Sequence, residues 1–269
     1  MISAIAHLGL LDDEDIALDI AALDLSVLDH DGIDLAPYRA LFDDFEADLR
    51  GAGGDRVESA AEQAGLLATI LAERHGLSGD AATYDAPLNA DMIRVLDRRR
   101  GLPVSLSIIY VAMARRLGWV ADALNTPGHV LVRIGPVDDF VIIDPFRNGV
   151  PVSADTVLNL VRDVLGPDAP LDQSYVAPMS NRMVLVRLLL NQATRAEDGG
   201  DPARALAVYE RMVEIAPGNG ASWWALARLQ LAAGKVEDAR ISLSSMLEVT
   251  RHADSRAHIV AALEALQGR

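Results

Sequence analysis

The sequence predicts an α+β chain with a helical N-terminal region, a core that joins one buried helix to a small antiparallel sheet, and an all-α C-terminal domain. Three observations predict this order. Segment 104–117 is apolar on almost every side until Arg115, as expected of a helix in the centre of a domain. Three short runs rich in β-branched residues follow, and from Arg182 onward small and bulky residues recur with a 34-residue period. The predicted parts are an acidic helical region that packs on the core (1–80), the core (81–180) and the repeats (181–269).

Composition and charge narrow the classes of function. Half of the 269 residues are hydrophobic (51%), and the formal net charge is −15. The first fifty positions hold thirteen acidic residues against two arginines, Arg39 and Arg50. Phosphate-bearing surfaces repel such a chain, so we expect neither nucleic acid nor a membrane as its partner. A solubilising acidic face is the simplest explanation of the excess charge.

Two absences in the sequence limit its chemistry. The chain contains no cysteine, which excludes disulfides, thiolate metal sites and every thiol nucleophile. The histidines have no metal-ligand spacing and there is no glycine-rich phosphate loop, so we expect no metal and no cofactor. The first eleven residues carry no basic start, which fits neither a signal peptide nor a transit peptide and predicts a cytoplasmic protein.

Helical spacing of apolar residues predicts several helices around the buried one. They are expected within 15–49, divided at Asp31-Gly32, then at 57–75, 90–99 and 157–165. We expect Asn89 to cap the 90–99 helix and Gly101 to end it, after a polar loop at 78–87. The buried helix begins at Pro103, where a missing N–H costs no hydrogen bond.

The three strand-like runs predict a hairpin with a candidate acid–base pair. They cover 119–124, 129–134 and 140–144. If a four-residue loop joins Ile134 to Asp139, the antiparallel register places His129 directly opposite Asp144. A carboxylate there accepts an imidazole N–H and fixes its tautomer, which supplies two members of a nucleophile–His–Asp triad. The same pair also occurs as a purely structural contact at the end of a sheet.

The C-terminal period aligns residues that lie 34 positions apart. The aligned pairs are Ala193 with Ala227, Gly200 with Gly234, Ala205 with Ala239, Tyr209 with Leu243 and Met212 with Met246. This pattern resembles the tetratricopeptide repeat, with small residues at close helix crossings and a glycine in the turn. Two units and a final helix at 255–266 are expected, and the resemblance implies a groove that binds a protein or peptide.

Four motifs in the core occur in a specific order. They are Gly101-Leu102-Pro103-Val104-Ser105-Leu106-Ser107, Ala114-Arg115-Arg116-Leu117-Gly118, Pro127-Gly128-His129-Val130-Leu131-Val132-Arg133 and Ile143-Asp144-Pro145-Phe146-Arg147-Asn148-Gly149. Together with the repeats they resemble the bacterial SirB-type family, in which a transglutaminase-like core with a papain-related fold precedes tetratricopeptide repeats. The resemblance implies that the Cys-His-Asp triad of the superfamily falls on Pro103, His129 and Asp144.

The nucleophile does not carry over with the resemblance. Pro103 has neither a thiol nor a hydroxyl, so ordinary transglutaminase or cysteine-protease chemistry is excluded. Ser105 and Ser107 lie further into the same helix. Each either eases helix–sheet packing as a small polar residue or, most readily for Ser105, is activated by His129 and Asp144.

Six other side chains are candidates for binding a partner. They are Arg100, Asn125, Arg133, Arg147, Trp223 and Trp224. The run Arg98-Arg99-Arg100 either grips an acidic peptide or a phosphate, or pairs with the acidic first helices of its own chain. The two tryptophans either line a peptide groove or pack inside the domain.

Two functions stay open on sequence alone. The favoured one is a non-catalytic interaction or regulatory module whose His129–Asp144 pair is vestigial and whose repeats bind a protein or peptide. The alternative is an acyltransferase or hydrolase with Ser105, His129 and Asp144 as its triad. A Ser105 hydroxyl within hydrogen-bond reach of the His129 ring, beside an open cleft, favours the enzyme.

Overall fold

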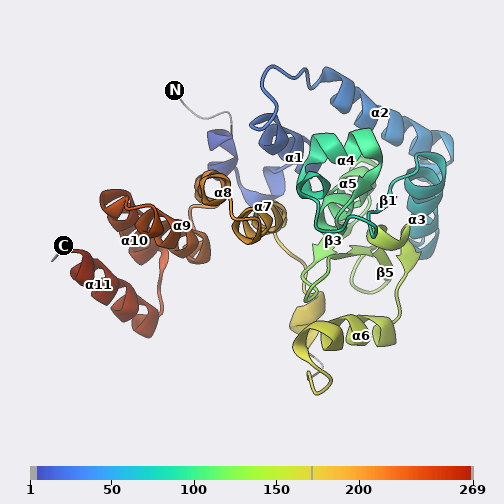
Figure 1. Ribbon diagram of the computed structural model, residues 1–269. Coiled ribbons are helices and arrows are strands. Elements are labelled where there is room, and N and C mark those ends of the chain that lie inside the picture. The colour runs from blue at the N-terminus through green and yellow to red at the C-terminus, as the bar shows by residue number, and fades with distance from the viewer. Residues whose placement is uncertain (1–4, 171, 268–269) are drawn as a thin grey trace. The chain divides into compact units, whose positions relative to one another are not determined.

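The structure is a computed structural model that describes residues 5–170 and 172–267. It confirms the predicted α+β class, with a small sheet among helices followed by a purely helical region (Figure 1). Backbone contacts divide the chain into two compact units, residues 13–185 and residues 186–269 with the described part of 1–12. The three-part division at residues 80 and 180 stays a prediction.

The N-terminal helices of the first unit follow the predicted pattern. They are α1 (Leu18–Val27), α2 (Ala36–Gly51) and α3 (Ala60–Leu67). The side chain of Ser59 caps α3 by accepting from the backbone N–H of Glu62. The predicted 57–75 helix is present, but its second half, Ala68–Arg74, widens into a π-helix.

Helix α4 (Met92–Arg98) differs from its prediction at both ends. Asp91, not Asn89, caps it by accepting from the backbone N–H of Arg94. It ends at Arg99, which adopts the left-handed conformation (φ 58), rather than at Gly101. The predicted polar loop also contains a short strand, β1 (Ser78–Gly79), paired in parallel with β2 (Arg100–Gly101).

Helix α5 (Pro103–Arg116) is the centre of the first unit, as predicted. Every side chain from Pro103 to Ala114 is buried. Because it contacts α1 and α2 as well as the sheet, α5 has almost no surface left for solvent. Its start is therefore an interior position.

The sheet has four antiparallel strands in sequence order, one more than predicted. They are β3 (Ala121–Leu124), β4 (Leu131–Ile134), β5 (Val141–Asp144) and β6 (Val150–Pro151). The predicted register is wrong: Ile134 pairs with Val141, so His129 precedes β4 and is not a ladder partner of Asp144. The connecting loop is longer than assumed: the Gly135 N–H bonds to the carbonyl of Val120, the residue before β3, and the Asp139 N–H bonds to the Pro136 carbonyl.

Helices cover both faces of this sheet. Val132 and Ile143 pair across the strands and are fully buried. Because side chains alternate between the two faces of a strand, Leu131 and Ile142 point to the opposite face of the sheet. Leu131 instead belongs to a cluster with Val157 of α6 (Ala154–Leu165). The sheet is thus a middle layer between helices, and this packing holds the ends of β4 and β5 in place.

The second unit is the predicted helical array. Its helices are α7 (Asn181–Asp198, which begins in the first unit), α8 (Pro202–Ile215), α9 (Gly220–Ala232), α10 (Val236–Val249) and α11 (Ala253–Gln267). Helix α10 begins and ends one repeat period after α8 begins and ends. Gly200 and Gly234 adopt the same left-handed turn, with φ of 72 and 74. The short helix Ala6–Gly9 also packs on α8. Among the described residues, no helix combines the length and the apolar composition needed to cross a membrane.

Candidate functional site

A histidine and an aspartate meet at one end of the sheet. His129 Nε2 lies 3.0 Å from Asp144 Oδ1, and the two side chains are 11% and 2% exposed. His129 is held by a turn in which its N–H bonds to the carbonyl of Thr126, and Asp144 is the last residue of β5. The contact expected from the sequence is therefore present although the register that suggested it is not. A carboxylate so placed can orient the imidazole and fix its tautomer.

Asp144 is the best anchored member of this pair. Its Oδ1 also accepts the backbone N–H of Phe146 at 3.0 Å, and Arg147 Nε lies 3.6 Å from its Oδ2. Its carbonyl accepts from the N–H of Gly149 at 2.8 Å. Gly149 has φ 74, and a Cβ there would lie 2.9 Å from the ring of Tyr110 on α5. The sheet end thus approaches α5 closely because the chain has glycine at this turn.

An aromatic row lies beside His129. The Phe146 ring makes edge contacts with His129 and with Tyr84, at centroid distances of 6.0 and 5.7 Å. Tyr84 is 37% exposed, so the row runs from the buried pair toward the surface. Aromatic side chains of this kind contribute binding area at low entropy cost.

The start of α5 holds no free hydroxyl among the described residues. Pro103 is the first residue of the helix and is buried. The Ser105 hydroxyl is fully buried and donates to the carbonyl of Asn89 at 2.8 Å. The Ser107 hydroxyl donates to the carbonyl of Val130 at 3.3 Å. Both serines therefore use their hydroxyl hydrogens on backbone carbonyls.

A polar cluster around the buried Asp80 and Asn89 supports this helix start. Asp80 accepts from the N–H and the hydroxyl of Thr83, at 2.9 and 2.7 Å, and from Arg98 Nη2 at 2.5 Å. These bonds from Thr83, and then Arg98, hold the pKa of Asp80 well below its usual value. Arg98 also donates to Asn89, whose amide donates to the Thr83 carbonyl. The cluster fixes the Asn89 carbonyl that Ser105 binds.

Tyr110 is a buried polar group that the sequence analysis did not single out. Its hydroxyl has no hydrogen-bond partner among the described residues. Burial, and then the charge of Asp144, raise the pKa of Tyr110 far above its usual value, so the phenol stays neutral. A tyrosine in an apolar helix gives no sequence pattern that could have revealed this neighbour of Asp144.

The predicted binding residues do not gather at one site. Only Arg147 contacts the His129–Asp144 pair. Arg133 donates to Asp122 at 2.6 Å across β3 and β4, and Arg100 donates to the Ser78 hydroxyl. Asn125 is exposed.

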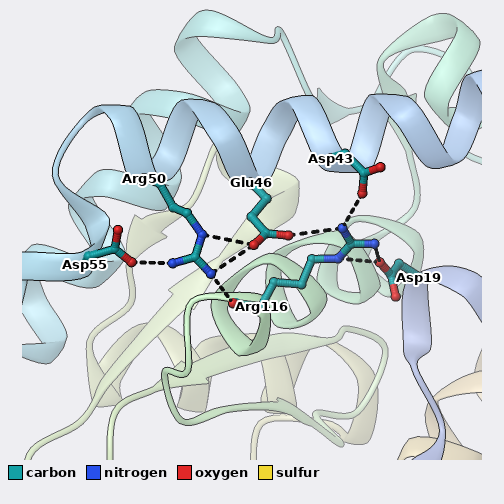
Figure 2. A network of polar contacts seen from close by, with 6 residues as sticks. All are labelled: Asp19, Asp43, Glu46, Arg50, Asp55 and Arg116. Atoms are coloured by element: carbon teal, nitrogen blue, oxygen red, sulfur yellow. Dashed lines mark hydrogen bonds and ion pairs between the residues drawn. The ribbon is translucent and has the colours of Figure 1, made fainter.

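The acidic N-terminal helices are held by a residue that the sequence analysis overlooked (Figure 2). Arg116, at the end of α5, lies 2.7 Å from Asp19, 2.8 Å from Asp43 and 3.2 Å from Glu46. Arg50 donates to Glu46 and to the Arg116 carbonyl. The run 98–100 forms no ion pair with these helices among the described residues: Arg98 bonds to Asp80, Arg100 bonds to Ser78, and Arg99 approaches α2 only through the ring of Phe45.

The repeat unit contains a groove of its own. A cavity of about 470 Å³ is lined by apolar residues of three helices, among them Trp224 of α9, Leu243 of α10 and Leu266 of α11, with Arg228 as its charged residue. Trp224 is 48% exposed. Trp223 instead donates its ring N–H to the Pro217 carbonyl of its own repeat at 2.8 Å. Of the two candidates, Trp224 lies in the groove.

Among residues 5–170 and 172–267 no group of three histidine, aspartate or glutamate side chains is arranged to hold a metal ion.

Comparison with known families agrees with this two-part structure. Residues 37–190 match a family described as "Transglutaminase-like superfamily", and residues 196–265 match a tetratricopeptide-repeat family. The first match contains His129 and Asp144, and the second contains the groove residue Trp224.

Relatives of similar length also occur. A UPF0162 protein of Xylella fastidiosa (strain 9a5c) is 32% identical over 266 residues, which cover 94% of this chain and 92% of that protein. A UPF0162 protein of Pseudomonas aeruginosa is 31% identical over 179 residues, 66% of this chain and 65% of that protein. A crystal structure of menin covers 91% of this chain and 69% of its own with 14% identity and a TM-score of 0.43, which is too low to establish a common fold.

Proposed function

We propose that this chain, which belongs to the transglutaminase-like superfamily and to the UPF0162 proteins, is a non-catalytic interaction module whose repeats bind a protein or peptide partner. The proposal includes the narrower SirB-type assignment and a cytoplasmic location. The observation that carries it is the start of α5, where the position expected for a nucleophile is the buried Pro103.

The chemistry of the helix start supports a scaffold. No cysteine occurs anywhere in the 269 residues, so no thiolate can act there. Ser105, the nearest hydroxyl in sequence, is fully buried and bound to the Asn89 carbonyl rather than to an imidazole. A serine becomes a nucleophile only when a base removes its proton, and a carbonyl oxygen is not such a base.

The repeat groove supports the interaction role. Tetratricopeptide repeats generally bind peptides on helix-lined grooves. Trp224 places a half-exposed aromatic ring in a mostly apolar cavity, and rings of this kind dominate the energy of protein interfaces.

The test is capture of a partner from the native host by the intact chain and by variants. Trp224→Ala removes the groove ring, whereas Ile241→Ala removes an exposed apolar side chain of the same unit that does not line the groove. We expect the partner to be lost with Trp224→Ala and kept with Ile241→Ala and His129→Ala. A partner kept by all three variants would contradict the role of the groove.

One observation favours the competing hydrolase or acyltransferase. His129 and Asp144 form an oriented acid–base pair in the layer that packs on α5, and such a pair is one part of a catalytic triad. In that case Ser105 would have to turn from the Asn89 carbonyl to the imidazole. Turnover of a p-nitrophenyl ester by the intact chain, lost in both Ser105→Ala and His129→Ala, would establish the enzyme; equal background rates in all three support the module.

A further inference from the structure

A second groove lies in the other unit, between α2 and α4. It has a cavity of about 500 Å³, and its apolar lining includes Ile33, Leu41 and Leu96. Three exposed carboxylates, those of Asp34, Asp44 and Asp97, also line it. This groove is separate from both the His129–Asp144 pair and the Trp224 groove, and the proposed function does not use it.

The carboxylates of this groove are not neutralised as those on the neighbouring side of α2 are. Asp43 and Glu46 contact Arg116 (Figure 2). Asp44, which also belongs to α2, makes no hydrogen bond or ion pair with any described residue. Asp97 accepts from the Tyr38 hydroxyl at 3.0 Å, and its nearest cation, Arg94, is 3.8 Å away and exposed. The groove therefore keeps most of its negative charge.

An arginine without an acceptor lines the same groove. Arg99 contributes to the lining, yet its guanidinium makes no hydrogen bond with a described residue, and its Nη1 is completely buried. The guanidinium carbon lies 5.5 Å from the centre of the Phe45 ring. Because Arg99 contributes to the lining and none of its guanidinium N–H groups is bonded to a described residue, the groove presents donor capacity beside its carboxylates.

We propose that this groove binds a basic, partly apolar peptide segment of a partner protein. A lysine or arginine side chain of that segment pairs with Asp44 and Asp97, an aliphatic neighbour packs on the half-buried Ile33 and Leu41, and a backbone carbonyl accepts from Arg99 at a nitrogen other than the buried Nη1. The chemistry of the groove excludes simpler ligands: three carboxylates repel a phosphate, and the arginine and the apolar lining do not suit a bare divalent cation.

Fluorescence anisotropy with a labelled short peptide of alternating leucine and arginine tests the proposal on the full chain. We expect binding that weakens about tenfold in Asp44→Asn/Asp97→Asn, because two exposed ion pairs are lost. Asp163→Asn/Asp168→Asn removes the same charge from α6 and the loop after it, and it should bind like the unmodified protein. Arg99→Gln removes a cation and makes the groove more negative, which by itself would favour the arginine-containing peptide, so weaker binding of this variant would indicate that the guanidinium donates to the peptide.

Three results would overturn the proposal. They are no binding to the unmodified chain, equal weakening by the two double variants, which would reveal only non-specific attraction to a protein of charge −15, and equal binding of a peptide with glutamate in place of arginine. Thermal unfolding of each variant establishes that it is folded. Because Trp224 is intact in all of them, failure here leaves the test of the repeat groove independent.

Discussion

The end of the sheet and the start of α5 differ in the chemical groups that they offer for catalysis. At the sheet end, His129 and Asp144 have the contact that acid–base chemistry needs, and Asp144 also fixes the turn that follows β5. At the helix start, Pro103 is inert and Ser105 is bound to a carbonyl. The difference teaches that the acid–base pair has a structural role of its own, because Asp144 also binds the turn after β5, whereas the serine hydroxyl nearest the helix start is bound to a backbone carbonyl.

The largest expected effect tests whether Asp144 stabilises the fold at the end of the sheet. Asp144→Ala leaves the His129 ring and the Phe146 N–H without their buried acceptor. We expect the free energy of unfolding to fall by about 3 kcal/mol, measured by urea unfolding. Asp144→Asn, which keeps one oxygen acceptor, should lose clearly less. Equal stability of Asp144→Ala and the unmodified chain would show that the pair does not support the fold.

The next effect tests the close approach between the sheet end and α5. In Gly149→Ala the new Cβ meets the Tyr110 ring at 2.9 Å and the backbone must keep φ 74, so we expect a loss of about 2 kcal/mol. Gly118→Ala is the matched control, because Gly118 has φ 79 and nothing within 4 Å of the added Cβ. It should lose only about 1 kcal/mol in the same urea measurement. If the two variants are equally stable, Tyr110 does not restrict this turn.

A smaller effect is expected at the helix start. Ser105→Ala removes one donor to the Asn89 carbonyl, which still accepts from the backbone N–H of Leu102 at 3.1 Å. The free energy of unfolding should fall by about 1 kcal/mol. A much larger loss in thermal or urea unfolding would mean that Ser105 has a structural role comparable with that of Asp144.

The smallest expected change concerns pH. The pKa of Asp80 is lowered in the folded chain by bonds from Thr83 and Arg98, so its stabilising effect is complete above about pH 4, the ordinary range of an unfolded aspartate, and declines below it. In Asp80→Asn this part of the acid sensitivity is absent. Urea unfolding across the acid range should show the stability difference between the two proteins narrowing as the pH falls, and a constant difference would contradict the lowered pKa.

Local patterns in the sequence predict much of the fold. The apolar run of α5, the split between α1 and α2 and the period shared by α8 and α10 depend on neighbouring residues, and the structure confirms them. The order of helices and sheet follows from the same patterns. The contact of His129 with Asp144 was also expected, but from a wrong register, since the length of the loop after β4 depends on the long-range bond from Gly135 to the Val120 carbonyl.

Long-range contacts explain what the sequence did not predict. The pairing of β1 with β2 joins segments too short to have a strand pattern. Arg116 lies 97 positions from Asp19, so charge counting alone could not choose it over the arginine run before α5. The partner of Ser105 is a backbone carbonyl, which no residue type encodes.

The central claim is that the helix start supplies no activated hydroxyl to His129. Intact-protein mass spectrometry after treatment with a fluorophosphonate tests it most directly. We predict no covalent adduct on the unmodified chain, since Ser105 is buried and bound to Asn89. A stoichiometric adduct that disappears in both Ser105→Ala and His129→Ala would contradict the account and establish a working serine nucleophile.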